Sequence, residues 1–488
     1  MNNKEIFDKF LKFENDNKYF DIEYKNIKIW EILRSYLYID IEMFYNNLQP
    51  LFPQNTSVKR KQISLNIIKN SFKLFFIKNK DFIFLNNPRR VKQKDSKYYC
   101  IYTDLIIDTL KKQYSCVTLE DPYWSLSPTS AFSHFMPQKT NDICFLDFME
   151  YIYRIKKIIF KKIYKKEYVK LHSMIIKLQK EIEKEFKCNL DNITKLAEEK
   201  VLYCLLLKSD YEKIINRIKP KIIFEFYDVF PSKLIINKIA KEKNIPIIEI
   251  QHGIVTKQNP IFLKYYDIEK KYDCMPNYIF SFGKKLLQKN NMPIKSQNII
   301  YIGNSFLNYK KNEYKSIKKD KKYILFISQS NLGEHISQFA SNLADLLKEN
   351  RDYKIIYKMH PYEIGNTYEC LKKNNIIVIN DREKDLYYYQ RKSVAQVGVY
   401  STGLYEGLFF NLDTYIIEKF YGVDEIKDIL GSNELVSYVK TEKELYDMII
   451  KKSLKPSKIV KSNIYWHSYS EEKLKEEVER ILKTHLKV

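Results

Sequence analysis

The sequence predicts an α/β protein built from two doubly wound domains in tandem. Three observations carry this prediction. Short apolar runs rich in Ile alternate with amphipathic segments over residues 97–308, the alternation resumes over 309–455, and a long helical stretch at 149–218 interrupts the first series. Continuous apolar runs separated by helices are typical of parallel strands that are buried on both faces. We therefore expect two Rossmann-type domains facing a central cleft, with a helical insertion in the N-terminal half.

The first domain is expected to span residues 97–308, after a basic, amphipathic region of residues 1–96. Its strands are predicted at 97–104, 115–120, 221–228, 245–250, 277–282 and 298–303, with helices near 105–114, 231–243 and 284–290.

The second domain is expected to span residues 309–455 and to be followed by a helical tail, 456–488. Its strands are predicted at 322–328, 353–359, 375–380, 394–400 and 414–418, with helices near 334–349, from Ser401–Thr402 onward, and at 471–487. Open α/β sheets bind ligands outside the carboxyl ends of their strands. Two such domains in tandem place a binding cleft between those ends.

Positive charge dominates two segments of the chain. The 488 residues include 84 Lys+Arg and 60 Asp+Glu, a formal net charge of +24, and the charge is densest at 59–94 and 154–170. Apolar residues recur every three to four positions in the second segment, as in an amphipathic helix with a basic polar face. This pattern favours an anionic membrane surface or glycolipid as a partner, although a solvated face in a Lys-rich proteome fits it too. Nucleic acid is not expected, because no nucleic-acid motif accompanies the charge.

Cysteine usage and hydropathy indicate the compartment. The seven cysteines are scattered and never form a CxxC pair, which argues against a disulfide framework and against a structural zinc site. The N-terminal residues lack the apolar core of a secretory signal, and no stretch reaches the ~20 apolar residues that span a bilayer. We expect a cytoplasmic protein, peripheral on the inner face of a bacterial plasma membrane.

Candidate bases follow two strands of the first domain. His252 and Gly253 come directly after Glu249 and Gln251 at the end of the 245–250 strand. A Gly after the His lets the backbone turn sharply and points the imidazole into the cleft, where it serves as a general base or as a donor to an anionic substrate; the alternative is a histidine that only caps the strand end. The carboxylates at the end of the 221–228 strand, Glu225 and Asp228, are alternative bases, although a merely buried or capping carboxylate fits these positions equally well.

Candidate phosphate ligands follow three strands of the second domain. His360, held by Pro361, suits a nucleotide phosphate or leaving group, and Lys358 adds charge there or is merely solvated. Ser401 and Thr402 open a helix, whose free N–H groups and dipole form an anion site. One turn later stands Glu406, within reach of a ribose diol. The loop after the 322–328 strand adds three weaker candidates, Ser328, Gln329 and Ser330.

Motifs of other common chemistries are missing from the chain. We find no GxxxxGK[ST], GxGxxG, HExxH or GxSxG pattern. We therefore expect no metal ion and no cofactor besides a nucleotide-activated co-substrate.

The order of strand–QHG, strand–HP and strand–S[ST] with a following Glu resembles bacterial surface- and capsular-polysaccharide glycosyltransferases of the GT-B fold, over roughly residues 220–420. The relatives in kind are Kdo transferases and polysialyltransferases that use CMP-sugars. The resemblance extends to teichoic-acid polymerases that transfer polyol phosphate from CDP-glycerol. It implies that His360, Ser401 and Thr402 bind the donor phosphate and that Glu406 binds the ribose.

The catalytic base is left open by this resemblance. His252 matches the His-Gly histidine of the polyol-phosphate enzymes, where it is thought to act as base. The acidic pair followed by Gly of the polysialyltransferases has no clear equivalent, so Asp228, Glu225 and His252 all remain candidates.

The function expected from the sequence is a metal-independent glycosyltransferase. It would move a sugar from a nucleotide donor, such as a CMP-sugar, to a lipid-linked or oligosaccharide acceptor of a capsular or other surface polysaccharide. The alternatives are a polyol- or sugar-phosphate transferase of the teichoic-acid type, a non-catalytic scaffold for polysaccharide assembly, and other nucleotide-sugar chemistry such as epimerisation.

Overall fold

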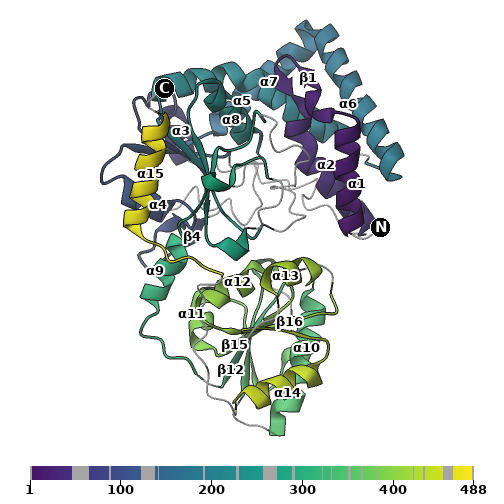
Figure 1. Ribbon diagram of the computed structural model, residues 1–488, viewed down its shortest axis with the longest axis vertical. Coiled ribbons are helices and arrows are strands. Elements are labelled where there is room, and N and C mark those ends of the chain that lie inside the picture. Colours follow the sequence, from purple (N-terminus) through teal and green to yellow (C-terminus); the bar gives the residue numbers. More distant parts are fainter. Residues whose placement is uncertain are drawn as a thin grey trace.

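The computed structural model describes residues 3–46, 65–86, 90–122, 138–140, 142–190, 193–226, 230–255, 272–287, 292–320, 322–330, 332–349, 353–363, 367–381, 383–420, 423–431, 435–453 and 465–485. Two parallel sheets, each flanked by helices, form two domains stacked along the long axis of the molecule (Figure 1).

The N-terminal domain is organised around a seven-stranded parallel sheet of order β11-β10-β9-β8-β3-β6-β7. Its strands are β3 (Phe82–Asn86), β6 (Cys116–Glu120), β7 (Ile143–Phe145), β8 (Ile222–Glu225), β9 (Ile247–Ile250), β10 (Tyr278–Ser281) and β11 (Ile299–Tyr301). Residues on both faces of the central strands are buried, as expected when helices cover both sides of a sheet. The direction of strand addition reverses between β3 and β8.

The C-terminal domain contains a six-stranded parallel sheet of order β14-β13-β12-β15-β16-β17. Its strands are β12 (Tyr323–Ile327), β13 (Lys354–Lys358), β14 (Ile376–Ile379), β15 (Ala395–Gly398), β16 (Asp413–Ile417) and β17 (Val436–Val439). Counted along the chain, this is the 3-2-1-4-5-6 order of Rossmann-type nucleotide-binding domains, with its reversal between β12 and β15. The predicted fold class, two Rossmann-type domains in a GT-B-like arrangement, is confirmed.

The helical insertion lies between β7 and β8 and packs against the N-terminal helices. It consists of α5 (Asp147–Ile163), α6 (Lys165–Phe186) and α7 (Ile193–Ile218), while α1 (Asn3–Asp16) and α2 (Ile29–Tyr45) lie beside them (Figure 1). The remaining helices of this domain are α3 (Leu65–Lys73), α4 (Asp104–Leu110), α8 (Pro231–Glu242) and α9 (Ser305–Glu313). A buried ion pair of Arg34 with Glu14 joins α2 to α1.

The helices of the C-terminal domain are α10 (Gly333–Leu346), α11 (Leu386–Lys392), α12 (Thr402–Phe409), α13 (Val423–Leu430) and α14 (Glu442–Ser453). The last helix, α15 (Glu471–His485), returns to the N-terminal domain, where Leu474, Val478 and Ile481 share a core cluster with Phe82 (Figure 1). The chain before it contacts both domains: Trp466 donates its indole N–H to the Tyr405 carbonyl, and the His467 N–H bonds the Phe282 carbonyl. The tail therefore ties the two domains together.

The structure differs from the sequence expectation at the start of the first domain. The sheet includes β3, paired between β8 and β6, and this strand lies within the region 1–96 that we expected to be separate. Lysines and asparagines flank this apolar run, so the sequence was interpreted there as part of a basic, amphipathic region and not as a strand. The predicted 97–104 strand instead forms a short antiparallel hairpin of β4 (Arg90–Lys92) with β5 (Tyr98–Cys100). The edge strands β7 and β17, three and four residues long, were not predicted.

Among the described residues, no helix is long and apolar enough to cross a lipid bilayer.

Candidate active site

A cavity lies between the two domains, where strand ends from both sheets meet. His252, Gly253 and Tyr102 line it from the N-terminal domain, and Thr402 and Glu406 line it from the C-terminal domain. The other lining residues are Ile101, Ile254, Phe282, Asn304, Phe306, Tyr387, Tyr405 and Trp466. The structure thus brings together three residues that the sequence predicted to share a site: His252, Thr402 and Glu406.

His252 is held at the cavity wall by a buried carboxylate. Glu249, fully buried on β9, places Oε1 at 3.5 Å from His252 Nδ1, and the imidazole itself remains 15% exposed. The ring of Tyr102 stands perpendicular to the imidazole, with centroids 6.3 Å apart. A carboxylate beside Nδ1 orients an imidazole and stabilises its protonated form, as a general base requires. Glu249 is therefore placed to orient the His252 imidazole, and it is outside the set of residues that line the cavity.

The residues that follow β9 on either side of His252 shape its surroundings. Gln251 is buried; its Oε1 accepts hydrogen bonds from Ser281 Oγ and the Phe282 N–H, both at 2.8 Å, and its Nε2 donates to the Gly253 carbonyl. Gln251 thus joins the carboxyl ends of β9 and β10. Gly253 is not in the left-handed region, and a Cβ added to it would meet no atom within 4 Å. The expectation of a glycine-dependent turn is therefore wrong, and the missing side chain leaves space at the cavity.

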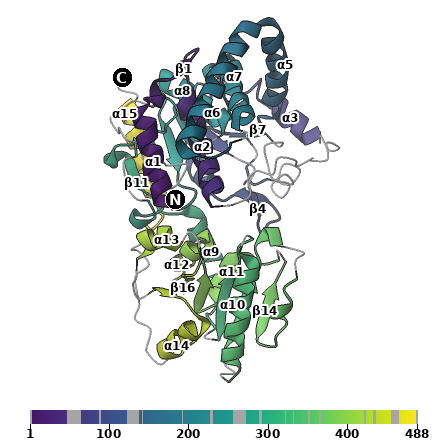
Figure 2. The ribbon, with the colours of Figure 1, turned by 90° about the vertical axis from the view of Figure 1, so that its right-hand side faces the viewer.

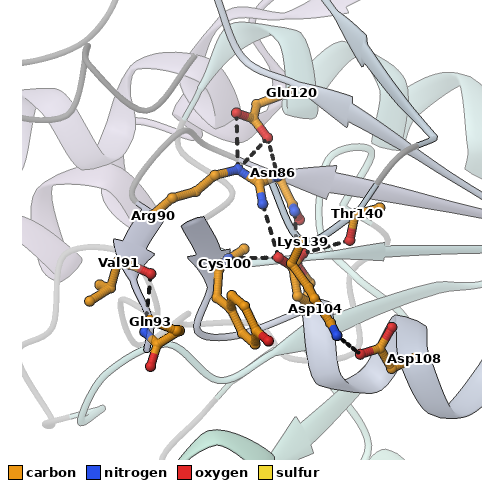
Figure 3. Close-up of polar contacts among 12 residues, drawn as sticks. Asn86, Arg90, Val91, Gln93, Cys100, Asp104, Asp108, Glu120, Lys139 and Thr140 are labelled. Carbon is orange, nitrogen blue, oxygen red and sulfur yellow. Dashed lines mark hydrogen bonds and ion pairs between the residues drawn. The ribbon is translucent and has the colours of Figure 1, made fainter. Parts of the chain in front are cut away.

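A buried ionic network supports the wall that carries Tyr102 (Figure 3). The Arg90 guanidinium donates to Glu120 at 3.1 Å and to Asp104 at 3.0 Å, and all three side chains are buried. Asp104, the first residue of α4, also accepts the Cys100 N–H at 2.9 Å. Since the β4–β5 hairpin leads directly into Tyr102, this network fixes the path of the cavity wall. The network of Arg90, Glu120 and Asp104 was not predicted, because no local sequence pattern marks these residues.

The C-terminal half of the site is built where the strand order reverses, between β12 and β15. Gln329 Oε1 accepts the Tyr400 N–H at 3.0 Å and so joins the loops that follow the two strands. Ser401 caps α12, its Oγ accepting the Gly403 N–H at 3.3 Å, while Thr402 is exposed and faces the cavity. Ser330 is exposed in the same loop as Gln329. Reversal points of this kind are where Rossmann-type sheets bind nucleotides.

Glu363 organises the loops after β12 and β13, and the sequence analysis did not single it out. This buried carboxylate accepts the His360 N–H at 2.7 Å, the Ser328 hydroxyl at 2.9 Å and the Tyr368 hydroxyl at 2.7 Å. A Cβ on Gly333 would lie 1.8 Å from Glu363 Oε1, so α10 must begin with glycine there. In the sequence, Glu363 is marked only by its position two residues after the His360–Pro361 pair.

The pKa values of His360 and Glu406, two candidate ligands in the C-terminal domain, are shifted in opposite directions. Burial lowers the pKa of the His360 imidazole, although the Glu363 carboxylate opposes this. Burial raises the pKa of Glu406 to about 7, and a hydrogen bond from Tyr387 opposes the rise. His360 is outside the set of residues that line the cavity.

Three further candidates do not face the cavity or cannot be placed. Glu225 is buried inside the N-terminal domain and accepts a hydrogen bond from the Asn237 amide at 2.7 Å. Lys358 donates to the Asp381 carbonyl at 2.6 Å and lies over the ring of Tyr389. Asp228 lies outside the described residues.

No group of three or more His, Cys, Asp or Glu side chains in the described part of the chain could hold a metal ion.

Comparisons with known proteins find similarity in structure only. No protein-family model and no curated protein matches the chain. Similar solved structures include UDP-GlcNAc 2-epimerase from Methanocaldococcus jannaschii, at 12% identity and a TM-score of 0.47, covering 83% of this chain and 99% of that one. The same enzyme from Neisseria meningitidis, bound to UDP-GlcNAc, gives 13% identity and a TM-score of 0.48 over 83% and 99% of the two chains.

The glycotransferase of kitacinnamycin gives 10% identity and a TM-score of 0.45, covering 83% of this chain and 96% of that one. Similarity at this level indicates neither a shared substrate nor a shared reaction.

Proposed function

We propose that the protein is a glycosyltransferase that uses a nucleotide-activated sugar. The observation that carries the proposal is the cavity between the domains, with the His252–Glu249 pair on one wall and Thr402 and Glu406 on the other. Sugar transfer needs a base for the acceptor hydroxyl and a group that stabilises the departing phosphate. One cavity here offers candidates for both.

The C-terminal domain would bind the donor. The N-terminus of α12 offers backbone N–H groups and a favourable dipole to the donor phosphate, with the Thr402 hydroxyl beside them. Glu406, one turn further, would accept hydrogen bonds from the ribose hydroxyls. Ser328 and His360 would lie toward the phosphate from the neighbouring loops. The proposal gives no role to a divalent cation.

The N-terminal domain would activate the acceptor. His252 would take the proton of an acceptor hydroxyl as its oxygen bonds to the anomeric carbon, while the bond from that carbon to the donor phosphate breaks and the nucleotide leaves. Glu249 would stabilise the resulting imidazolium. The acceptor would be a lipid-linked or oligosaccharide end of a growing capsular or other surface polysaccharide.

The cavity volume of about 40 Å³ is far below the roughly 300–1,000 Å³ of ligand pockets. The domains would therefore separate to admit the donor and close again for the reaction, which also excludes water. The tail before α15, which contacts both domains, is the connection that such a movement would strain.

A CMP-sugar is the donor that we propose, on the motif resemblance. A polyol-phosphate transferase of the teichoic-acid type remains a second candidate, because the candidate base on the N-terminal wall of the cavity is a histidine rather than a carboxylate. Mass spectrometry of an elongated acceptor separates the two, since only the second reaction adds phosphorus to the product.

The experiment that tests the proposal is a thermal-shift panel with CMP, CDP, UDP and GDP, followed by turnover with the matching nucleotide sugar. We expect one nucleotide class to raise Tm, and His360→Ala to reduce turnover. His335→Ala is the matched control, because His335 lies on α10 against Phe420. The proposal fails if no nucleotide stabilises the protein, or if His360→Ala turns over like the wild type.

A further inference from the structure

The outward face of α5 is apolar, although its inward face already packs into the core. Met149, Tyr153 and Phe160 are buried, as in any amphipathic helix. On the opposite face, Ile155, Ile158 and Ile163 are 60%, 56% and 70% exposed, and Tyr151 and Ile159 are exposed beside them. A surface helix ordinarily presents polar residues there. The sequence predicts a basic polar face for this helix, and the exposed face carries isoleucines as well as basic residues.

The apolar surface continues onto neighbouring helices. Phe72, on α3, is 48% exposed, and Phe76, just beyond the helix, is 76% exposed. The ring of Phe72 lies 5.4 Å from that of Phe148, which in turn lies 6.5 Å from the ring of Tyr151 on α5. Figure 2 shows α3 next to α5 at the edge of the N-terminal domain, far from the C-terminal domain. On the other side, Tyr164 and Val169 extend the exposed surface toward α6.

Seven of the eight basic residues of segment 154–170 fall into two groups. Lys156, Lys157 and Lys161 form ion pairs with acidic residues of α7, namely Asp210, Glu199 and Glu198. These lysines hold the insertion together. Arg154, Lys162, Lys165 and Lys166 are exposed and border the isoleucines. The surface therefore combines a protruding apolar strip with cations that point to solvent.

We propose that this surface, comprising the outward residues of α5, Tyr164 and Val169 of α6, and Phe72 and Phe76 near α3, docks on an anionic lipid bilayer. The isoleucines and aromatic rings would enter the boundary between headgroups and acyl chains, and the bordering cations would meet lipid phosphates. A second copy of the chain fits this surface less well. In a symmetric dimer the same four basic residues of each copy would face each other without an anion between them.

Sedimentation of the full-length protein with vesicles tests the proposal. Vesicles of phosphatidylcholine alone are compared with vesicles that also contain phosphatidylglycerol. We expect binding to the anionic vesicles that weakens with salt, and a loss of about tenfold or more in I158S/I163S, as two buried isoleucines are removed from the lipid. The matched control is I377S/V378S, because these residues are similarly apolar and exposed on β14 of the other domain.

A second pair of variants tests the charge. K162Q/K166Q is expected to bind anionic vesicles several-fold more weakly, whereas K348Q/K443Q, which changes exposed lysines of the C-terminal domain, binds like the wild type. The proposal is overturned if the protein binds neither vesicle, binds both equally, or binds unchanged as I158S/I163S. It is also overturned if I158S/I163S converts a dimer into a monomer without any vesicle binding. Nucleotide thermal shifts should be unchanged in these variants, so the result is independent of the proposed reaction.

Discussion

The buried carboxylate of Glu363 accepts the backbone N–H of His360 at 2.7 Å. The same carboxylate accepts the hydroxyl of Ser328 at 2.9 Å. One side chain therefore holds together the loops that follow β12 and β13, and both loops carry candidate phosphate ligands. The geometry of the donor half depends on a residue that need not contact the donor.

Replacing Glu363 by Gln should weaken both folding and donor binding. The amide keeps one acceptor oxygen but presents N–H donors where the carboxylate accepted hydrogen bonds, so a buried polar group loses its partner. We expect the free energy of unfolding to fall by about 1–3 kcal/mol and nucleotide affinity to fall by about tenfold, equivalent to ~1.4 kcal/mol. Urea denaturation and titration calorimetry measure the two effects.

The matched control is Glu369→Gln, which changes an exposed carboxylate whose ion pair is with Lys372. Surface pairs contribute roughly 0–1 kcal/mol, so this variant should keep wild-type stability and affinity. Equal behaviour of the two variants would show that Glu363 has no positioning role.

Replacing His252 by Asn should remove the proposed base while leaving the donor half intact. We expect turnover to fall by roughly 10²–10⁴-fold, with nucleotide affinity unchanged. Glu249→Gln should reduce turnover less and shift the acidic limb of the pH–rate profile, because the imidazolium loses its buried carboxylate. Steady-state kinetics across pH, together with calorimetry, separate the two effects. Loss of nucleotide binding in His252→Asn would contradict the division of roles.

Glu406 should make both stability and nucleotide affinity depend on pH. Its pKa of about 7 in the folded protein lies above the ordinary 4.5, so the folded state binds this proton more tightly than the unfolded state. Through this group, the free energy of unfolding falls as pH rises from about 4.5 to about 7, and Glu406→Gln should lack that decline. Denaturation at a series of pH values checks this.

Nucleotide affinity should change in the opposite direction across the same range. Only the ionised carboxylate accepts two hydrogen bonds from a ribose diol, so affinity should rise through pH 7 in the wild type. In Glu406→Gln it should stay flat over that range. A wild-type affinity that falls between pH 6 and 8, or the same profile in both proteins, would remove Glu406 from the ribose site.

Both sheets were largely predictable because their strands are local and apolar. The 245–250, 277–282 and 353–359 runs contain β9, β10 and β13, with ends that differ by only one or two residues. His252 belongs to one sheet and Thr402 and Glu406 follow the other, and their shared cavity follows from the rule that open α/β sheets bind ligands outside the carboxyl ends of their strands, applied to two domains in tandem. The strands, and the residues that directly follow them, could therefore be predicted from the sequence.

Long-range partners were not predictable. Arg90 lies thirty residues from Glu120, and nothing in the local pattern of either shows that they meet inside the domain. The C-terminal helix α15 reads as an isolated amphipathic helix, although its apolar face completes the core around Phe82. The prediction that Gly253 is needed for a sharp turn was wrong for a related reason. Whether a position needs glycine depends on its backbone φ angle and on the atoms near it in space, and neither can be read from the local sequence.

The Arg90 network should be costly to break. Replacing Arg90 by Met leaves Glu120 and Asp104 as two buried carboxylates without their shared cation. Removing one partner from a buried ionic group typically costs about 3–5 kcal/mol, and we expect a loss of that size in urea denaturation. Arg480→Met, which breaks an exposed pair with Glu477 on α15, is the control and should cost less than ~1 kcal/mol. A similar loss in both variants would contradict the structural role of Arg90.

Replacing Gly303 by Ala tests whether folding requires a glycine there, and replacing Gly253 by Ala tests whether the cavity does. Gly303 has a φ of +79°, and a Cβ there would lie 2.5 Å from the His467 carbonyl oxygen of the tail. Gly303→Ala should therefore cost at least roughly 1–2 kcal/mol of stability. Gly253→Ala meets no atom and should melt like the wild type, yet its methyl group narrows the space beside His252 and should lower turnover. Gly253→Ala with full turnover would mean that the acceptor does not pass this wall.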